Sequence, residues 1–321
     1  FENRDIKAEV TAKAEEQITE NAVFGSNTST LPISGLAQNS SRPDNFIGIH
    51  YFSPVEKMPL VEIIMGEKTS QETLAKTMDY VQKIKKTPIV VNDSRGFYTS
   101  RVFGTYTGEG VAMLAEGIKP ALIENAGKMT GMPMAPLALA DAVALDLAWK
   151  VTTQTKKDFE AEGKDFPITP MYSIMEEMVE KQGRFGKKNN KGFYEYPENG
   201  KKYLWPELSN LCKESDDQPD VEELKKRFLY IQAVETAKCF EENVLTDVRD
   251  ADIGAILGWG MAPWTGGPLS FIDMVGVKDF VAEADKLAQK YGERFTPCKL
   301  LRDMAAKNES FHKSGNSSQA A

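Results

Sequence analysis

The residue with the clearest chemical potential is His50, one of only two histidines in the sequence. It lies near the end of an apolar, strand-like run at residues 47–52, and Glu62 interrupts the next aliphatic run at 60–65. A carboxylate inside an aliphatic strand is costly to bury unless it has a partner, which a histidine on the adjacent strand would provide. If Glu62 accepts one ring N–H, the tautomer is fixed and the other nitrogen is free to act as a base near neutral pH. The two residues therefore predict a histidine general base oriented by a carboxylate.

Structural roles also fit both residues. His50 is compatible with a hydrogen-bonded, partly buried histidine, and Glu62 with a carboxylate that points to solvent from an edge strand. The catalytic interpretation is favoured by the turn that follows His50, because α/β folds commonly place reactive groups where a strand ends. The second histidine, His312, lies next to a small and polar tail and is expected to be a solvated surface residue.

Other polar segments carry weaker signals. A hydroxyl-rich turn at 26–30 follows a short apolar run, but small polar turns are common. Asp141 and Asp273 are expected to be structural acids at helix boundaries. Residues 183–188 resemble a phosphate-binding loop only loosely, because they lack the strand–loop–helix context that such a loop needs.

The elements that must position His50 and Glu62 are predicted from hydrophobic periodicity. One amphipathic helix pattern precedes the two residues, and a second helix pattern and a β-branched run follow them. Alternating helices and strands with short connections are typical of an α/β domain. From about residue 96 onward the pattern changes to one helix after another. The expected helices cover 5–21 and 70–85, and the expected strands cover 45–52, 60–65 and 87–91.

The helical part contains an internal repeat, which is the signature of duplicated modules. One stretch opens at Arg101, passes through Gly-Met-Pro-Met-Ala-Pro and reaches an aliphatic run ending in Asp141. A second stretch opens at Arg227, about 126 residues later, passes through Gly-Met-Ala-Pro and ends in Asp273. Two copies of one helical module are therefore predicted, with the turn-rich, charged residues 199–219 between them.

Composition limits the classes of function. A chain of 321 residues that is 41% apolar can bury a large core, and its net charge of −8 argues against a nucleic-acid partner, which needs a basic face. The longest apolar stretch, residues 137–149, is interrupted by two aspartates, so no transmembrane segment is expected. Widely spaced Cys212, Cys239 and Cys298 form neither a metal pattern nor a disulfide framework. They favour a reducing compartment, so we expect a cytoplasmic protein in a bacterium or a mitochondrial-matrix protein in a eukaryote.

An ordered set of motifs resembles the L-3-hydroxyacyl-CoA dehydrogenase family along essentially the whole chain. The set is specific because several segments match in both order and spacing. Two helical modules in tandem further resemble the multifunctional α subunit of the fatty acid oxidation complex, since single-function relatives usually carry one module per chain. The matching segments are 26–29, 48–54, 58–63, 93–97, 183–186 and 192–194.

The resemblance implies an NAD-dependent oxidoreductase of fatty-acid β-oxidation. In this family the histidine that maps to His50 takes the proton from the substrate 3-hydroxyl, and the carboxylate that maps to Glu62 is its partner. The serine that maps to Ser29 lies near the hydroxyl and the nicotinamide. The implied reaction is hydride transfer from C3 of an L-3-hydroxyacyl-CoA to NAD, which gives a 3-ketoacyl-CoA.

The resemblance also assigns binding residues, with two departures from the family pattern. Cofactor contacts map to Glu2, Lys7 and Ser29. Ser53 stands where relatives often carry a cofactor-contacting asparagine, and Ser100 stands where many relatives carry a substrate-binding asparagine. Serine can still donate one hydrogen bond, but its reach is shorter.

The sequence lacks the G-x-G-x-x-G turn of a dinucleotide-binding unit and the acid that would bind the adenosine ribose. We expect both upstream of Phe1, together with the enoyl-CoA hydratase domain of a multifunctional parent. That glycine turn and its helix N-terminus hold the pyrophosphate, so this chain alone is expected to bind NAD weakly or not at all and to be inactive. The family resemblance further implies a thiolase β subunit as partner, and an incomplete sheet favours an oligomer.

The expected architecture is a partial Rossmann domain followed by two all-α dehydrogenase C-terminal domains. Two alternatives stay open: a stand-alone dehydrogenase for a short 3-hydroxyacyl-CoA or 3-hydroxy acid, and a non-catalytic dimerisation or assembly module. The second helical module disfavours the first alternative. Cofactor binding would distinguish a catalytic protein from the second alternative. The predicted limits are 1–95 for the NAD-binding part, 96–198 for the first helical domain, 199–219 for a linker, 220–313 for the second helical domain and 314–321 for a disordered tail.

Overall fold

The computed structural model describes residues 2–161, 163–166 and 168–312, so the predicted disordered tail at 314–321 lies outside the described residues. The chain divides after Phe103 and again after Ile231 into two compact units. Unit 1 combines the N-terminal and C-terminal segments of the chain, and unit 2 is the segment between them.

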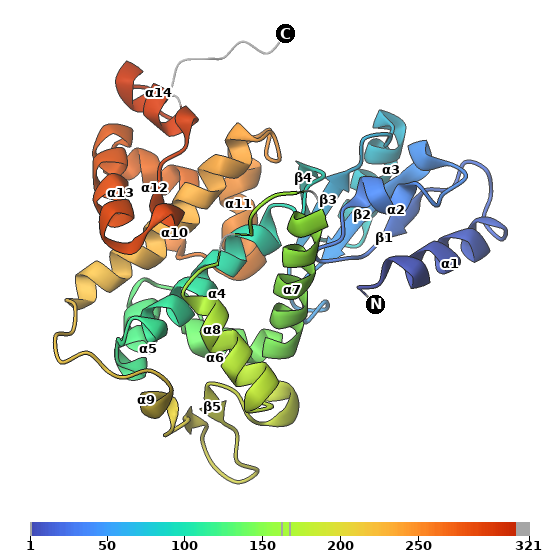
Figure 1. The fold of residues 1–321 in the computed structure, drawn as a ribbon. Helices are drawn as coiled ribbons and strands as arrows, with labels where there is room; N and C mark the ends of the chain where they lie inside the picture. Colours follow the sequence, from blue (N-terminus) through green and yellow to red (C-terminus); the bar gives the residue numbers. More distant parts are fainter. Residues whose placement is uncertain (1, 162, 167, 313–321) are drawn as a thin grey trace. The chain divides into compact units, whose positions relative to one another are not determined.

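Unit 1 is built around a four-stranded sheet (Figure 1). The strand order follows the sequence, with β1 parallel to β2, β2 antiparallel to β3, and β3 parallel to β4. β-branched and aliphatic residues dominate the three longer strands, as expected for buried sheet positions. The three predicted strands are confirmed to within one or two residues. The strands are β1 (Phe24–Ser26), β2 (Phe46–Tyr51), β3 (Leu60–Met65) and β4 (Thr87–Asn92).

Three helices belong to the N-terminal part of unit 1: α1 (Arg4–Glu15), α2 (Ile33–Ala37) and α3 (Gln71–Lys83). The prediction for α3 is confirmed, and the Ser70 side chain caps its first turn. The prediction that the first helix extends to residue 21 is wrong. The Arg42 guanidinium donates hydrogen bonds to the carbonyl oxygens of Glu15 and Thr19, so a tertiary contact takes the place of further helical bonds.

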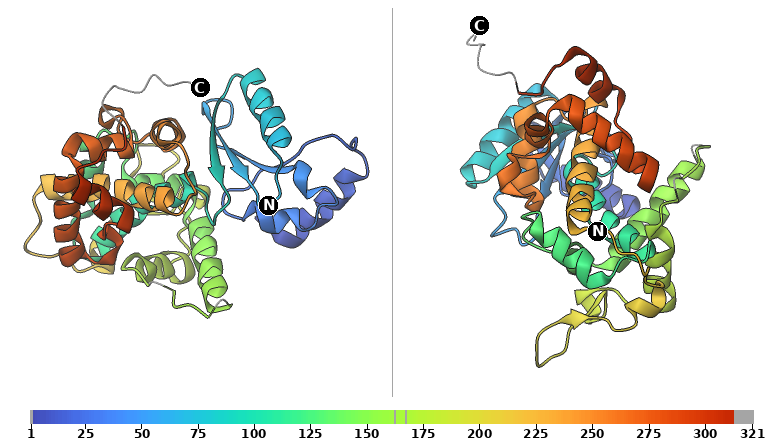
Figure 2. Two further views of the ribbon diagram at one scale, coloured as in Figure 1. Left: turned by 90° about the horizontal axis from the view of Figure 1, so that it is seen from above. Right: turned by 90° about the vertical axis from the view of Figure 1, so that its left-hand side faces the viewer.

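The two faces of the sheet have different partners, because successive strand residues point to opposite sides. Helix α3 packs against one face (Figure 2), where an aliphatic core forms. The other face carries His50 and Glu62 and is contacted by helix α11 (Val248–Trp259). The fully buried core on the α3 side consists of Ile47, Val61, Ile63 and Val81.

The outer edge of β4 is closed by residues from the C-terminal part of unit 1. Pro88 has no backbone N–H, the N–H of Val90 donates to the Asp250 carboxylate at 3.0 Å, and the N–H of Asn92 donates to the carbonyl of Val244 at 2.9 Å. Closed edges prevent strand addition. Among the described residues, no strand pairs with the opposite edge of the sheet, at β1.

Helices make up most of the rest of the chain. The predicted linker contains strand β6 and helix α9, and Leu208 within it is buried. The divisions between the two units fall inside α4 and α10, so the predicted domain limits at 95 and 219 stay a prediction. The remaining helices and strands are α4 (Thr99–Ala115), α5 (Pro120–Met129), α6 (Pro136–Val143), α7 (Leu145–Ala161), α8 (Met171–Glu176), β5 (Tyr194–Glu195), β6 (Tyr203–Leu204), α9 (Leu208–Leu211), α10 (Val221–Glu241), α12 (Pro268–Val275), α13 (Val277–Tyr291) and α14 (Lys299–Lys307).

The predicted repeat is visible in matching hydrogen bonds of α6 and α12. In unit 2, the Asp141 carboxylate in α6 accepts the backbone N–H groups of Phe193 and Tyr194 at 2.8 and 2.9 Å. In unit 1, the Asp273 carboxylate in α12 accepts the N–H groups of the consecutive residues 311 and 312 at 2.9 and 2.7 Å. The expected structural role is therefore confirmed: both acids lie in the last turn of their helices and anchor a distant segment of the same unit.

A second pair of carboxylates repeats in the same way. Glu124 in α5 accepts the N–H groups at the start of α6, those of Leu137 and Ala138. Asp252 in α11 accepts the N–H groups at the start of α12, those of Leu269 and Ser270. Carboxylates at helix N-termini satisfy otherwise unpaired donors and face the positive end of the helix dipole. Each module thus joins its second helix to its third through one acid.

The repeat also extends to two arginine clusters. In unit 2, Arg227 of α10 binds Glu109 and Glu116 of α4, with nitrogen–oxygen distances of 2.5 and 2.7 Å. In unit 1, Arg101 of α4 binds Glu235 and Glu242, both at 2.5 Å. Each member of one cluster lies about 126 residues from its counterpart in the other. Helices α4 and α10 therefore each supply the arginine of one of two equivalent ion-pair clusters.

Replacing Asp141 by asparagine is expected to lower the free energy of unfolding by about 1–3 kcal/mol, because the amide turns an NH₂ group toward a buried N–H donor. Burial raises the pKa of Asp141 to about 6, although the hydrogen bonds from Phe193 and Tyr194 lower it. The unfolding experiment is therefore done above pH 6, where the side chain is ionised. Urea unfolding measures the loss. Asp273→Asn is the matched control and should cost less, because Asp273 is only half-buried while Asp141 is fully buried. Equal losses would contradict this account.

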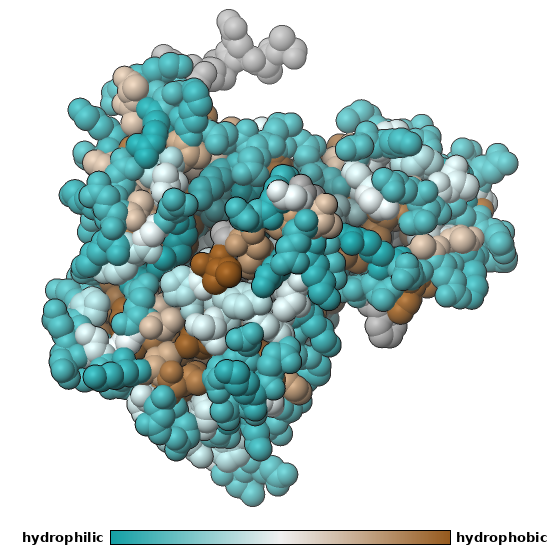
Figure 3. Space-filling model, viewed as in Figure 1, coloured by the Kyte–Doolittle hydropathy of each residue, from teal (hydrophilic) through white to brown (hydrophobic). Residues whose placement is uncertain are grey.

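The surface gives a further observation. Within the described part of the chain, no helix combines the length and the apolar character that crossing a bilayer requires. The face seen in Figure 3 is mostly hydrophilic, with apolar residues in small areas. This pattern fits a chain in which 27% of the residues are charged.

Candidate active site

The expected contact between His50 and Glu62 is present in unit 1. The antiparallel register of β2 and β3 places the two residues opposite each other, and Nδ1 of His50 lies 2.8 Å from Oε2 of Glu62. His50 is 5% exposed and Glu62 is fully buried. Among the described residues, Nε2 of His50 has no hydrogen-bond partner. The arrangement leaves that nitrogen available to accept a proton.

The other oxygen of Glu62 is held by the start of α4. The backbone N–H groups of Tyr98 and Thr99 both donate to Oε1 at 3.0 Å, and the Thr99 hydroxyl donates to Oε2 at 2.5 Å. The chain reaches this position through Gly96 and Phe97, which both adopt positive φ angles, 75° and 50°. A helix N-terminus stabilises a negative charge, so the start of α4 offers the buried Glu62 carboxylate both hydrogen-bond donors and a favourable dipole.

Thr99 is a site residue that sequence reasoning missed. The available signal was a hydroxyl residue two positions after the Gly96-Phe97 turn, where a helix was expected to begin. Such a side chain usually caps its own helix. Here it binds a carboxylate from another strand, which local spacing does not show.

Aromatic rings and α11 enclose the pair. The His50 ring lies 4.6 Å from the ring of Phe52 and 6.1 Å from that of Phe97, measured between centroids. Helix α11 approaches through Gly258, where a Cβ atom would lie 2.9 Å from Leu60 and 3.7 Å from Thr99. The second helical module therefore packs against the strands that carry the pair.

Three of the predicted cofactor residues gather at the loop after β1. The Glu2 carboxylate accepts the Ser29 N–H at 2.9 Å and the Thr28 hydroxyl at 2.8 Å. The Lys7 ammonium donates to the Asn27 carbonyl at 2.8 Å. Burial lowers the pKa of Lys7, and the neighbouring Glu2 charge opposes that change. Glu2, which precedes α1, and Lys7 of α1 therefore contact the loop that carries Ser29.

This loop lies at the same edge of the sheet as His50. Strands β1 and β2 are parallel, so the residues that follow β1 and the end of β2 meet at one side. The Tyr51 N–H donates to the Asn27 side chain at 3.3 Å, which links the end of β2 to the loop that follows β1. Ser53 is exposed just beyond β2, and Ser100 is half-buried in the first turn of α4. The predicted residues therefore occupy segments that adjoin the His50–Glu62 pair in sequence or in the sheet.

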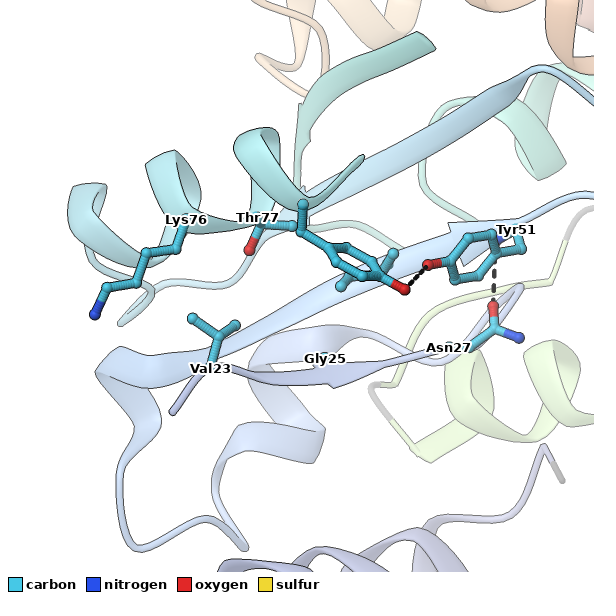
Figure 4. Close-up of a pocket in the computed structure, with 8 residues that line it drawn as sticks. Val23, Gly25, Asn27, Tyr51, Lys76 and Thr77 are labelled. Atoms are coloured by element: carbon cyan, nitrogen blue, oxygen red, sulfur yellow. Dashed lines mark hydrogen bonds between the residues drawn. The ribbon is translucent and has the colours of Figure 1, made fainter. Parts of the chain in front are cut away.

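A cavity of about 460 Å³ lies elsewhere in unit 1 (Figure 4). Ile49 and Tyr51 line it, and they alternate with His50 along β2, so the cavity opens on the opposite face of the sheet. Its far wall is α3, where Tyr80 accepts a hydrogen bond from the Tyr51 hydroxyl at 3.3 Å. Burial raises the pKa of Tyr51. The cavity is therefore separate from the His50 site.

The comparison with protein families is decisive once this geometry is known. Residues 1–94 match the model of the 3-hydroxyacyl-CoA dehydrogenase NAD-binding domain, and residues 96–196 match that of the 3-hydroxyacyl-CoA dehydrogenase C-terminal domain. Together the matches cover more than half of the chain. The chain belongs to the 3-hydroxyacyl-CoA dehydrogenase family. This confirms the predicted Rossmann-type domain followed by a helical dehydrogenase domain, and NAD as the cofactor.

Solved structures agree with the family assignment. The dehydrogenase part of multifunctional enzyme 1 from Caenorhabditis elegans is 27% identical, with a TM-score of 0.63, over 94% of this chain and 69% of that chain. (S)-3-Hydroxybutyryl-CoA dehydrogenase from Ralstonia eutropha is 35% identical, with a TM-score of 0.56, over 62% of this chain and 69% of that one. The alignment with 3-hydroxybutyryl-CoA dehydrogenase from Escherichia coli K12 covers 96% of this chain and 80% of that chain, with a TM-score of 0.77. At 22% identity, this last likeness concerns the fold alone.

The residues of this dehydrogenase fit NAD in part. The loop cluster of Glu2, Lys7 and Ser29 offers a carboxylate, an ammonium and a hydroxyl at the sheet edge that carries His50, which suits the polar groups of a ribose and a nicotinamide. The turn that would hold the pyrophosphate is absent from the sequence. The described residues therefore offer groups suited to one end of the cofactor.

Proposed function

We propose that this dehydrogenase oxidises the 3-hydroxyl of an L-3-hydroxyacyl-CoA to a ketone, with His50 as general base. The observation that supports this most directly is the chain of contacts from Nδ1 of His50 through Glu62 to the N-terminus of α4. Glu62 accepts a hydrogen bond from Nδ1–H of His50, which leaves the lone pair on Nε2 free. Its negative charge then stabilises the imidazolium that forms when Nε2 takes a proton.

The proposed step conserves atoms and charge. The substrate hydroxyl proton passes to Nε2 of His50, and the C3–H electron pair leaves as hydride while the C3–O double bond forms. When bound, NAD supplies the hydride acceptor. The imidazolium later releases its proton to solvent. Phe52 and Phe97 limit water around the ring, which strengthens the attraction between imidazolium and carboxylate.

The other predicted residues have binding roles in this proposal. The Ser29 hydroxyl binds near the substrate oxygen and the nicotinamide, while Glu2 and Lys7 bind the cofactor. Ser53 contributes to the cofactor site from the end of β2, and Ser100 binds substrate from the first turn of α4. Support comes from the family pattern, from the position of Ser29 and Ser53 beyond the neighbouring ends of β1 and β2, and from the position of Ser100 next to Thr99, which binds Glu62.

We further propose that the NAD-binding domain of the intact protein continues past β1 with strands that carry the glycine turn. The edge of β4 is closed by Val90–Asp250 and Asn92–Val244 contacts, so the sheet can grow only past β1. Beside β1 lies the cavity of Figure 4, whose Val23, Ile49 and Tyr51 offer an apolar surface on which a helix of the added unit can pack.

Calorimetry with NADH tests this proposal. A protein that also carries the upstream residues through the glycine turn should bind NADH at least about tenfold more tightly than residues 1–321, because only the longer protein can hold the pyrophosphate at a helix N-terminus. Equal affinities would show that residues 1–321 suffice and would overturn the proposed incomplete domain. Failure of both proteins to bind would overturn the proposed dehydrogenase site.

The parent protein is proposed to be a multifunctional enzyme of fatty-acid β-oxidation, with an enoyl-CoA hydratase domain, a thiolase β subunit as partner and an oligomeric state. Support comes from the tandem helical modules and from the similarity to the dehydrogenase part of a multifunctional enzyme over 94% of the chain. Three buried, free cysteines fit the proposed reducing compartment, such as bacterial cytoplasm. The length of the intact reading frame and copurification of a second subunit check this assignment.

A further inference from the structure

Glu62 receives four hydrogen bonds, and one of them comes from a side chain that the mechanism above does not use. Oε1 accepts the N–H groups of Tyr98 and Thr99, and Oε2 accepts Nδ1–H of His50 and the hydroxyl of Thr99. The hydroxyl contact is the shortest of the four at 2.5 Å, and Thr99 is 1% exposed. Two donors therefore share the oxygen that faces the imidazole.

We propose that Thr99 is a positioning residue that fixes Glu62 and, by sharing Oε2 with His50, lowers the basicity of the imidazole. This rests on the proposed function only for its effect on turnover, because the contact itself belongs to the folded chain. Ionised Glu62 can only accept hydrogen bonds, so the Thr99 hydroxyl must be the donor. A second donor disperses the negative charge on Oε2, which weakens its stabilisation of the imidazolium.

The side chain of Thr99 is held in the orientation that this role requires. A β-branched residue has few χ1 rotamers in a helix, so the position of its methyl group determines the direction of its hydroxyl. The methyl lies 3.7 Å from the place where a Cβ would extend from Gly258 of α11. The methyl therefore faces α11 at an ordinary contact distance, and the hydroxyl points to Glu62.

The titratable groups of the described residues do not replace the Thr99 hydroxyl as a hydrogen-bond donor to Glu62. Glu62 acts electrostatically on the phenol of Tyr98 and on the thiol of Cys239 from α10. Burial raises the pKa of both groups, so both are neutral at working pH. Asp252 of α11 faces the Tyr98 phenol, and its carboxylate is held by backbone N–H groups at the start of α12. Arg101 is occupied by Glu235 and Glu242.

The number of histidines makes the proposal measurable on this chain without cofactor or turnover. Only His50 and His312 contribute imidazole signals, so an NMR titration yields two curves, and a His312→Gln variant assigns them. Thr99→Val keeps the shape and the backbone N–H of Thr99 but removes the hydroxyl. We expect the measured His50 curve to move to higher pH in this variant, while the His312 curve keeps its position.

Thr99→Ser separates the hydroxyl from packing. It keeps the donor and should titrate like the unmodified chain. Should Thr99→Val fail to fold, Thr99→Ala against Thr99→Ser gives the same comparison. The proposal is overturned if the valine or alanine variant leaves the His50 curve unchanged, or if serine shifts it as much as valine does.

The same variants distinguish this inference from the proposed function. In the NAD-competent protein, Thr99→Val should move the acidic limb of the kcat/KM profile to higher pH by the amount seen in the NMR titration. A shifted NMR curve in a protein that lacks dehydrogenase activity would overturn the proposed function and leave the role of Thr99 intact. Dehydrogenase activity with an unshifted curve would overturn the role of Thr99 alone.

Discussion

Substituting His50 with glutamine is expected to lower kcat for 3-hydroxybutyryl-CoA by about 10²–10⁴-fold in the NAD-competent protein. Glutamine can donate its amide N–H to Glu62, so the buried carboxylate keeps a partner, but the amide cannot take a proton from the substrate. The loss should therefore appear in kcat with little change in the affinity for NADH. Steady-state rates of NADH formation and calorimetry measure the two quantities.

His312→Gln is the control for the His50 substitution. His312 binds Asp252 at 2.8 Å in the C-terminal part of unit 1, far along the chain from the β2–β3 pair, and its replacement should leave kcat within about twofold. If His50→Gln keeps more than about a tenth of the activity, His50 is not the base, because loss of a general base should lower the rate at least about 10²-fold.

The second large effect is expected at the buried arginine of unit 2. Arg227→Met should lower the free energy of unfolding by roughly 3–5 kcal/mol, because it removes the cation that compensates a buried carboxylate. The Arg227 and Glu109 side chains are 0% and 1% exposed, and the contact between them measures 2.5 Å. Methionine fills a similar volume, so the loss reports the charge rather than a cavity. Urea unfolding followed by circular dichroism measures it.

The repeat provides a matched control for this prediction. Arg101 makes the equivalent contacts in unit 1, but its side chain is 20% exposed and that of Glu242 is 50% exposed. Arg101→Met should therefore cost distinctly less, because solvent screens the remaining carboxylates. Adding Glu109→Gln to Arg227→Met should restore part of the stability, since the uncompensated charge is then gone. An equal cost at both arginines would contradict the role assigned to burial.

The sequence was sufficient to predict the three longer strands of the sheet and the His50–Glu62 contact, because both depend on local pattern, whereas the short strand β1 was not predicted. Period-two alternation places His50 and Glu62 on one face of adjacent strands, and a buried carboxylate needs a partner. The repeat was also detectable, since equivalent arginines and aspartates recur at a constant spacing. What the pattern left open was function, and the family comparison supplied the class of reaction.

The features that could not be predicted depend on contacts between distant segments. The first helix ends at Glu15 because Arg42 binds its last carbonyl groups, and β4 is closed because Asp250 reaches the Val90 N–H. Thr99 binds Glu62 because Gly96 and Phe97 turn the chain sharply before α4. The segments that Asp141 and Asp273 anchor were not predicted for the same reason. Composition and periodicity do not show which distant segment each of these residues contacts.

The most direct test of the central claim is the rate of NADH formation when the NAD-competent protein is given NAD and each enantiomer of 3-hydroxybutyryl-CoA. The account predicts NADH formation from the L enantiomer, strong preference over the D enantiomer, and a loss of about 10²–10⁴-fold in the His50→Gln variant. If the protein binds NADH but oxidises neither enantiomer, or if the His50→Gln variant is as fast as the unmodified protein, the assignment of His50 and Glu62 as the catalytic pair is contradicted.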